Sequence, residues 1–161
     1  MKELPFHIIP FQDSHQPDVD KLMSSIAEEY AENMFSAHYK TTKELSHLPE
    51  HQYWAACIDG TVVGTVGFCR LANNNIELKR MFLHKDFRGQ GIAKALLDTV
   101  MNDAIDSNVS TVFLGTMEQF KTAQAFYEKN GFIKIPITDL PTDFLVNPVD
   151  KVFYKKELIN Q

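Results

Sequence analysis

The pattern of hydrophobic and polar positions predicts four helices along the chain. Apolar residues recur at spacings of three and four over residues 18–30, which is typical of an amphipathic helix. The same spacing over residues 90–108 predicts a longer helix whose wide apolar stripe must pack on a sheet. Shorter helices are predicted over residues 42–48 and 120–130, while the pattern over residues 31–39 is ambiguous.

The remaining apolar runs are short and bounded by turn residues, which predicts strands. The clearest pair is a hairpin, in which residues 53–58 and 61–71 flank the two-residue turn Asp59-Gly60. The other predicted strands span residues 6–11, 76–83, 111–116, 132–137 and 152–156.

The order of these elements predicts an α+β protein, an α/β sandwich with helices on both faces of one mixed sheet. A first half rich in hairpins favours antiparallel pairing. Two later passages run from strand through helix to strand, at residues 76–116 and 111–137, and each predicts a parallel neighbour. With 161 residues and 44% hydrophobic content, the chain is expected to form a single domain over residues 1–161.

Charge and cysteine content narrow the classes of function. The net charge of -5 disfavours a nucleic-acid surface, because phosphate backbones select basic faces. No apolar run is long enough to cross a membrane, and the start of the sequence lacks the apolar core of a signal peptide, so a cytoplasmic protein is expected. The predicted hairpin places Cys57 opposite Val62 and far from Cys69, which argues against a disulfide. The spacing of the two cysteines matches no zinc site.

Residues 77–97 carry the strongest chemical signal in the sequence. A predicted strand leads into a predicted helix through a short turn made of Arg88, Gly89, Gln90 and Gly91. The first backbone N–H groups of a helix have no helical partner, and together with the helix dipole they attract anions, phosphates above all. The small residues Gly89, Gly91 and Ala93 let a ligand approach the backbone closely. We therefore predict that this turn binds a pyrophosphate.

Clustered basic residues strengthen this interpretation. Five of the 16 Lys and Arg residues fall within a short span, namely Lys79, Arg80, Lys85, Arg88 and Lys94. The alternative is an ordinary solvated helix start with surface charges. Two other glycine-rich phosphate motifs fail on spacing. Ile92 follows Gly91 where a Walker-type loop needs Lys, and Lys94 stands where a dinucleotide fingerprint needs Gly.

Three stretches together resemble the GNAT family of acetyl-CoA-dependent N-acetyltransferases. They are residues 77–97, the string Phe113-Leu-Gly-Thr116 and the string Ala123-Gln-Ala-Phe-Tyr-Glu-Lys-Asn-Gly-Phe132. The resemblance covers the second half of the chain well, whereas the first half fits in element order only. It implies a mixed, mostly antiparallel sheet of about seven strands, splayed between the fourth and fifth, with acetyl-CoA as co-substrate and no metal.

The resemblance also implies which residues hold the cofactor. Backbone groups of Met81, Phe82 and Leu83 would bond the pantetheine arm inserted at the splay. The pyrophosphate would bind the N–H groups of the turn and of the first helical residues, namely Arg88, Gly89, Gln90, Gly91, Ile92 and Ala93. Many family members carry an Asn near the start of the last helix, where this sequence has Phe120. Either Gln119 replaces that contact or the contact is missing.

The same resemblance indicates two candidates for catalysis. In the family, the tyrosine that matches Tyr127 protonates the departing CoA thiolate; the alternative is an amphipathic tyrosine at a helix–sheet boundary. Many members place a carboxylate on the fourth strand to deprotonate the amine, which here is Glu77. The alternative is a half-exposed strand residue paired with Lys79 or Arg80. His84 lies nearer the predicted phosphates than the amine and is interpreted as structural.

The acceptor is predicted to be a primary amine of a small molecule or peptide. Acidic residues outnumber basic ones over residues 11–50, which favours a cationic amine such as a polyamine, an aminoglycoside or a lysine-like group. The alternative is a solvated acidic face. The loop at residues 139–150 would line the same site or form a homodimer contact. Cys57 and Cys69 lack neighbouring base signatures, so the acetyl group is expected to pass directly to the amine.

Two other functions fit parts of the pattern. A non-catalytic module that binds acetyl-CoA for regulation would keep the turn but release no thiol, and the presence of both Glu77 and Tyr127 argues against it. A Rossmann-type nucleotide-binding protein would respond to NAD in place of acetyl-CoA.

Overall fold

The described part of the chain forms a seven-stranded mixed sheet in the order β1-β2-β3-β4-β5-β7-β6. The computed structural model describes residues 5–30 and 40–158, so the ambiguous stretch at residues 31–39 lies outside the described residues. The strands are β1 (His7–Pro10), β2 (His51–Ile58), β3 (Thr61–Leu71), β4 (Asn75–Leu83), β5 (Thr111–Thr116), β6 (Ile133–Ile135) and β7 (Val152–Glu157). The helices are α1 (Gln16–Tyr30), α2 (Thr42–Ser46), α3 (Ile92–Asp106) and α4 (Lys121–Lys129). Each of these elements was predicted from the sequence, with ends displaced by a few residues.

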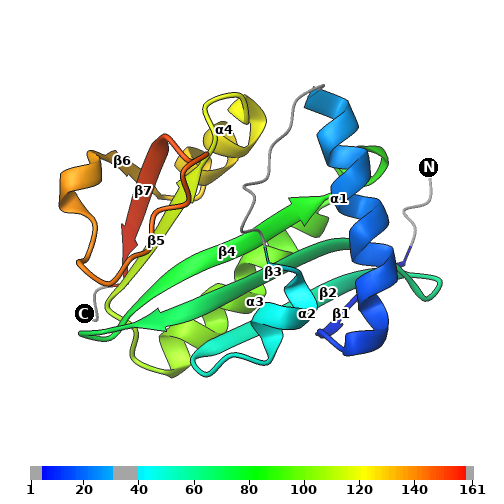
Figure 1. The fold of residues 1–161 in the computed structure, drawn as a ribbon, viewed down its shortest axis with the longest axis horizontal. Coiled ribbons are helices and arrows are strands. Elements are labelled where there is room, and N and C mark those ends of the chain that lie inside the picture. Colours follow the sequence, from blue (N-terminus) through cyan, green and yellow to red (C-terminus); the bar gives the residue numbers. More distant parts are fainter. Residues whose placement is uncertain (1–4, 31–39, 159–161) are drawn as a thin grey trace.

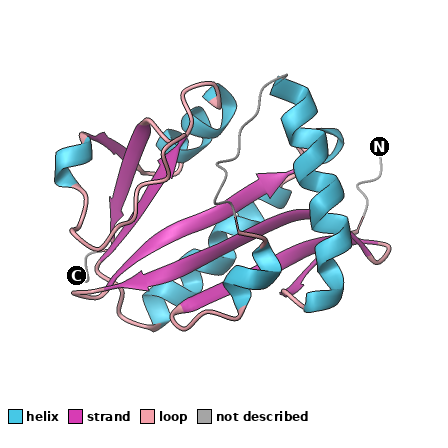
Figure 2. Ribbon diagram, viewed as in Figure 1, coloured by secondary structure: helices cyan, strands magenta, loops and turns pink. Residues whose placement is uncertain are grey.

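Helices cover both faces of the sheet (Figure 1, Figure 2). Alternate residues of β2 divide between the two faces, as the pleat of a strand requires. Trp54 and Ala56 pack in the large cluster that contains the side chains of α3. Ala55 and Cys57 pack in a second cluster with Val19 of α1. No described helix is both long and apolar enough to cross a membrane.

The apolar stripe of α3 is narrower than predicted. Its buried side chains are Ile92, Leu96, Leu97, Val100, Met101 and Ala104. The sequence pattern places Ile105 in the same stripe, but that side chain is 58% exposed. Each step of four residues rotates a side chain by about 40° around the helix axis, so the second line of the stripe has turned away from the sheet by its last member.

The hairpin between β2 and β3 confirms the register predicted from its turn. Cys57 pairs with Val62, and both Cys57 and Cys69 are free. Asp59 and Gly60 have φ values of 49° and 78°, the left-handed conformation at both central positions that a tight hairpin turn requires.

The order of the last strands differs from the prediction. β4 and β5 are parallel neighbours, as expected, but β6 does not lie beside β5. β7 lies between them and is antiparallel to both. Phe153 and Tyr154 of β7 are buried in clusters on opposite faces, whereas Ile133 of β6 is exposed. A strand that is buried on both faces belongs inside the sheet, and a short strand that is largely exposed belongs at the edge.

The sheet splits between β4 and β5. The two strands pair only over residues 75–77 of β4 and 111–113 of β5. Beyond that point they diverge, and the two arrows separate in Figure 1. Residues 78–83 therefore have one edge without a strand partner, and residues 114–116 pair only with β7.

A bulge in β4 lies beside the splay. Thr65 of β3 pairs with Phe82, and Gly67 pairs with Lys79, so β4 carries one extra residue between these pairs. Arg80 takes up the irregularity with a φ of 53°, and the Thr65 hydroxyl donates to its carbonyl at 2.7 Å. The extra residue places Lys79 and Phe82 on the same face of the sheet, the face covered by α1.

Candidate active site

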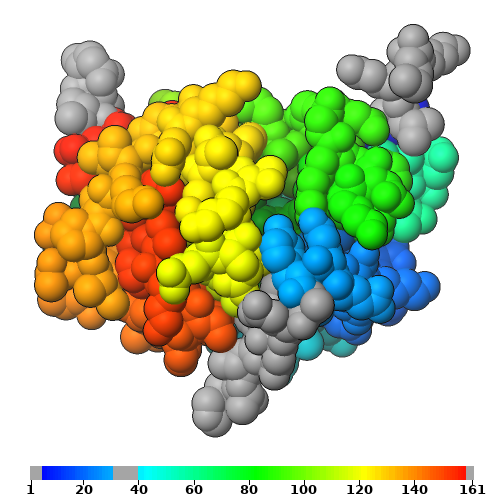
Figure 3. Space-filling model, turned by 90° about the horizontal axis from the view of Figure 1, so that it is seen from above, coloured from blue at the N-terminus to red at the C-terminus, as the bar shows by residue number. Residues whose placement is uncertain are grey.

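Two adjoining cavities occupy the space where β4 and β5 diverge. The first cavity, about 220 Å³ in volume, lies among α1, the end of β4, the turn before α3, and α4. The second cavity, about 150 Å³, lies among β4, β5, α4 and the loop before β7. The residues that line both are Met81, Phe82, Phe120, Ala123 and Tyr127. Figure 3 looks onto this face, where α4 (yellow), the β4–α3 region (green) and α1 (blue) meet around a hollow.

A glycine turn closes one end of the first cavity. Gly89 and Gly91 have φ values of 80° and 84°, the left-handed region that favours glycine. A Cβ added at either position would meet no atom within 4 Å, so the space in front of the turn is open. Within the described residues, the N–H groups of Gly89, Gln90 and Gly91 donate to no backbone carbonyl. The turn thus has the free donors and the open space that a pyrophosphate needs.

Backbone groups, more than side chains, are available to an anion at this turn. The side chain of Ile92, the first residue of α3, is buried in the main core, so its backbone N–H group is the part left for a ligand. Ala93 lines the first cavity with a small side chain. The nearby Lys94 is paired along the helix, with its Nζ 2.5 Å from the carboxylate of Asp98. The predicted basic cluster is therefore partly neutralised by its own neighbours.

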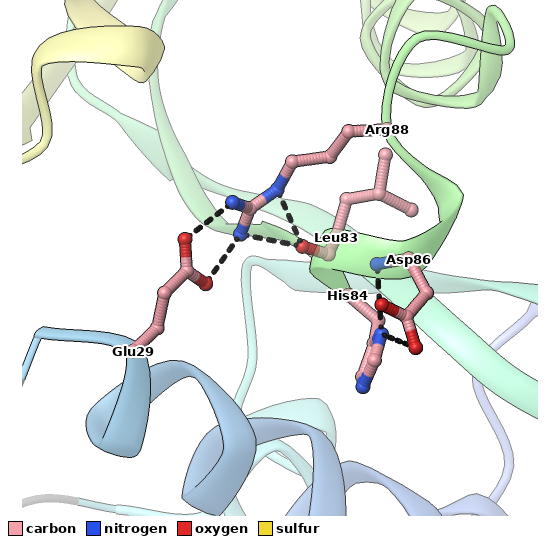
Figure 4. Close-up of polar contacts among 5 residues, drawn as sticks. All are labelled: Glu29, Leu83, His84, Asp86 and Arg88. Carbon is pink, nitrogen blue, oxygen red and sulfur yellow. Dashed lines mark hydrogen bonds and ion pairs between the residues drawn. The ribbon is translucent and has the colours of Figure 1, made fainter.

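The side chain of Arg88 is held at the edge of the first cavity by several hydrogen bonds (Figure 4). Its Nη1 and Nη2 donate to the two carboxylate oxygens of Glu29 on α1, at 2.6 and 3.0 Å. Its Nε and Nη2 also donate to the backbone carbonyl of Leu83, at 3.2 and 2.9 Å. The guanidinium thus joins the glycine turn to α1 and to the end of β4. A full contact between this side chain and a phosphate requires the bonds to Glu29 to open.

The end of β4 presents backbone groups to the first cavity. Met81, Phe82 and Leu83, predicted to bind pantetheine, all line it. Their strand has no partner on the side of β5, and such an edge can bind an extended chain through main-chain hydrogen bonds. The carbonyl of Leu83 is already engaged by Arg88.

Tyr127 lies at the junction of the two cavities. It extends from α4 and is 5% exposed. Its ring packs edge-on against Phe126 and Phe132, at centroid distances of 5.8 and 5.7 Å. Burial raises the pKa of the phenol, and the carboxylate of Asp150 raises it further. The hydroxyl therefore keeps its proton at neutral pH and is suited to donate it.

The second cavity contains two carboxylates and a lysine. Oε2 of Glu77, the predicted base, lies 3.4 Å from Nζ of Lys79. Burial raises the pKa of Glu77, Lys79 lowers it, and Asp150 raises it again. Asp150, in the loop before β7, lines the same cavity. Burial raises the pKa of Asp150 to about 6, against the lowering effect of Lys79.

The sequence predicted that the loop at residues 139–150 would line the acceptor site or form a dimer contact, but it did not single out Asp150. This loop has no periodicity, so no pattern distinguishes that carboxylate from its neighbours. The available signal was Gly115, a glycine inside β5, because such a glycine often marks a close approach by another group. A Cβ at Gly115 would lie 3.1 Å from Oδ2 of Asp150.

The acidic face predicted to attract a cationic amine is partly engaged in internal contacts. Asp13 pairs with His47 at 2.8 Å, and Asp18 accepts from a backbone N–H of β3 at 3.1 Å. Glu44 bonds the N-cap of α2, and Glu29 binds Arg88. Fewer of these carboxylates are open to a ligand than the sequence indicates.

Other predicted residues lie at the borders of the site. Phe120, the N-cap of α4, packs its ring against Tyr30 at 4.8 Å. Gln119 directly precedes it, and its contact with the cofactor stays a prediction. Nδ1 of His84 accepts from the N–H of Asp86 at 3.1 Å (Figure 4), which agrees with a structural role. Over residues 5–30 and 40–158, no group of three His, Cys, Asp or Glu residues is placed to hold a metal ion.

Comparison with known families identifies the chain. The model described as the acetyltransferase (GNAT) family matches residues 19–132. The chain belongs to the GNAT acetyltransferase family. The matched span includes Glu29, Glu77, the glycine turn and Tyr127, and it ends before Asp150.

Solved structures share the GNAT fold of this chain. A GNAT acetyltransferase from Staphylococcus aureus Mu50 has a TM-score of 0.81 and 32% identity, covering 96% of this chain and 100% of that chain. PaiA N-acetyltransferase from Thermoplasma acidophilum, solved in complex with coenzyme A, has a TM-score of 0.74 and 21% identity, covering 96% and 99%.

A curated GNAT relative is longer than this chain. N-acetylaspartate synthetase from Danio rerio is 37% identical over 107 residues, which cover 64% of this chain and 38% of the relative. The chain thus spans less than half the length of this relative.

Proposed function

We propose that the protein transfers an acetyl group from acetyl-CoA to the primary amine of a small molecule bound in the second cavity. The observation that carries the proposal is the position of Tyr127, which lines both cavities and keeps its proton. One cavity ends at a turn suited to a pyrophosphate, and the other contains charged groups suited to an amine. A proton donor between these two sites matches acyl transfer from a thioester, whose thiolate must be protonated as it leaves.

The first cavity fits acetyl-CoA in its chemistry. The glycine turn would hold the pyrophosphate, and the unpaired edge at Met81, Phe82 and Leu83 would bond the amides of the pantetheine arm. When bound, acetyl-CoA supplies an activated acyl group beside Tyr127. The coenzyme A present in the PaiA structure supports this assignment.

We infer that the acetyl group passes directly to the amine. Neither Cys57 nor Cys69 is among the described residues that line the cavities. Burial raises the pKa of both thiols. A thiol with a raised pKa forms little thiolate at neutral pH, so neither cysteine is suited to carry the acetyl group.

The acceptor is proposed to be an amine that also carries a carboxylate. The lining of the second cavity carries two acidic side chains, Glu77 and Asp150, and two basic ones, Lys79 and Arg80. Because the two signs of charge are balanced, this lining does not select a purely cationic ligand. A volume of about 150 Å³ is below the roughly 300 Å³ at which drug-sized pockets begin, which favours an amino acid over a larger amine. The relative from Danio rerio is named N-acetylaspartate synthetase, and aspartate carries both an amine and carboxylates. A polyamine or aminoglycoside is the second candidate, supported by the acidic residues of α1 and α2.

The loop before β7 is proposed to form a wall of the acceptor site rather than a homodimer contact. Leu145 lines the second cavity although its side chain is 82% exposed. The adjacent Phe144 is buried with Phe113 and Phe153, which anchors the loop on the sheet.

An acetylation screen with detection of free CoA tests the proposed function. The panel contains aspartate, glutamate, their methyl esters, a polyamine, an aminoglycoside and a lysine peptide. We expect release of CoA with an amino acid, and a loss of at least about tenfold in kcat/KM on esterification, because a lost hydrogen bond to a charged group costs about 1.5–3 kcal/mol. Release with the polyamine alone would favour the second candidate. Binding of acetyl-CoA without release for any amine would favour the non-catalytic module.

Glu29 is predicted to oppose cofactor binding. Its carboxylate holds Arg88 and places a negative charge beside the turn that would bind the pyrophosphate. Glu29→Gln removes this charge and keeps the shape of the side chain. Acetyl-CoA should then bind about two- to fivefold more tightly, in keeping with the 0–1 kcal/mol of a partly exposed ion pair. Titration calorimetry of the variant and the unchanged protein measures the difference.

Glu28→Gln is the matched control for this measurement. It removes the same charge from the same helix, but Glu28 is exposed and makes no contact with Arg88. Its affinity for acetyl-CoA should match that of the unchanged protein. If Glu29→Gln bound acetyl-CoA more weakly, Glu29 would be a residue that positions Arg88 for phosphate, contrary to the prediction.

A further inference from the structure

We propose that Asp150 is the residue that takes the proton from the acceptor amine. The inference rests on the proposed function, because it requires an amine in the second cavity. It concerns a part of the chain outside the span matched by the family model, which ends at residue 132.

The backbone around Asp150 is fixed on the sheet. The N–H of Asp150 donates to the carbonyl of Asn147 at 2.9 Å. The N–H of Lys151 donates to the carbonyl of Thr116, at the end of β5, at 3.0 Å. The absence of a side chain at Gly115 leaves the room that Oδ2 of Asp150 occupies. The carboxylate is therefore positioned beside the splay, where the second cavity meets α4.

Asp150 is better placed for this role than Glu77. The carboxylate of Glu77 accepts a hydrogen bond from Lys79, whereas in the described part of the chain the carboxylate of Asp150 has no hydrogen-bond partner. The pKa of the Tyr127 phenol is raised by burial and, next, by the charge of Asp150. Tyr127 would protonate the departing sulfur, and Asp150 lines the same cavity as Tyr127, so an amine that attacks the acetyl carbon there would lie within its reach.

The proposed step balances in protons and bonds. The amine enters as an ammonium group, and one N–H proton passes to an oxygen of Asp150, which restores the nitrogen lone pair. That lone pair forms a bond to the acetyl carbonyl carbon as the carbon–sulfur bond breaks, and the Tyr127 hydroxyl gives its proton to the sulfur. The second proton lost by nitrogen replaces the one given by Tyr127, and the proton on Asp150 returns to solvent.

The charged groups around Asp150 set the pH range in which this step operates. Glu77 and Lys79 of β4 and Tyr127 of α4 face it. With its pKa raised to about 6, Asp150 is ionised at neutral pH and is close to the best strength for a general base there. Because only the ionised form accepts a proton, kcat/KM should rise with pH through about 6.

The pH profile of Asp150→Asn tests the proposal. We expect kcat/KM at neutral pH to fall by about ten- to a hundredfold and the rise near pH 6 to disappear. Activity should recover at alkaline pH, where the acceptor loses its proton without help. Asp106→Asn, which changes an exposed carboxylate at the end of α3 that lines neither cavity, should leave the profile unchanged. A rise in melting temperature with acetyl-CoA shows that each variant is folded.

Several results would overturn the assignment. One is a profile for Asp150→Asn that keeps the rise near pH 6 with kcat/KM within about twofold of the unchanged protein. Another is loss of the rise in Glu77→Gln alone, which would move the role to Glu77. If acetyl-CoA does not raise the melting temperature of Asp150→Asn, the proposal is tested with Asp150→Glu instead. That variant retains a carboxylate, so its kcat/KM must still rise with pH. An unchanged protein that acetylates no amine would instead refute the proposed function.

Discussion

Replacing Tyr127 with phenylalanine is expected to lower kcat by about a hundred- to a thousandfold, because the variant loses the proton donor at the junction of the two cavities. The phenylalanine ring can keep the contacts with Phe126 and Phe132. Among the described residues, the Tyr127 hydroxyl makes no hydrogen bond that the substitution would break, so the fold should be unaffected. Acetyl-CoA affinity should therefore stay within about twofold. Steady-state release of CoA and calorimetry measure the two quantities.

Tyr154→Phe is the control for loss of a buried phenol. Its ring centroid lies 6.0 Å from that of Tyr127, and its hydroxyl donates to Glu128 at 2.6 Å, but it lines neither cavity. We expect a lower melting temperature and an unchanged kcat. A Tyr127→Phe variant with kcat within about threefold of the unchanged protein would exclude the hydroxyl as the acid.

Gly91→Val is expected to weaken acetyl-CoA binding by about a hundredfold or more. The valine side chain would fill the open space in front of the turn, and the loss of even one hydrogen bond to a phosphate costs about 1.5–3 kcal/mol. A branched residue at a φ of 84° also strains the N-cap of α3 by about 1–2 kcal/mol. Calorimetric titration with acetyl-CoA measures the affinity, and thermal unfolding measures the strain.

Gly60→Val separates these two effects. Gly60 has a φ of 78° and, like Gly91, has no atom within 4 Å of an added Cβ, but it lies in the hairpin turn between β2 and β3. The two variants should lose similar stability, and only Gly91→Val should lose affinity for acetyl-CoA. Similar affinities in both would place the pyrophosphate away from this turn.

Local chemistry explains why much of this fold could be predicted from the sequence. Asp59 and Gly60 can both adopt a positive φ, so they fix the hairpin and with it the register of β2 on β3. Gly89 and Gly91 mark the turn before α3 for the same reason. Tyr127 was found because the string around it resembles that of a known family, not because periodicity separates it from core aromatic residues.

The missed features depend on contacts between residues that are distant in the sequence. β7 takes its place beside β5 because both of its faces are buried, and only the assembled sheet decides that. The bulge at Arg80 depends on the partner strand. It could not be predicted because Arg80 has a positive φ at a position where the sequence has no glycine. The ion pair between Glu29 and Arg88 joins residues 59 positions apart. Asp150 enters the site only because its loop crosses Gly115.

Transfer of a labelled acetyl group measures the proposed reaction itself. The protein is incubated with acetyl-CoA that carries a deuterated acetyl group and with the preferred amine of the screen, and both products and protein are weighed by mass spectrometry. We expect one labelled acetyl group on the amine for each CoA released, and no label on the protein. CoA release without a labelled amine, or label retained on Cys57 or Cys69, would contradict direct transfer to an amine in the second cavity.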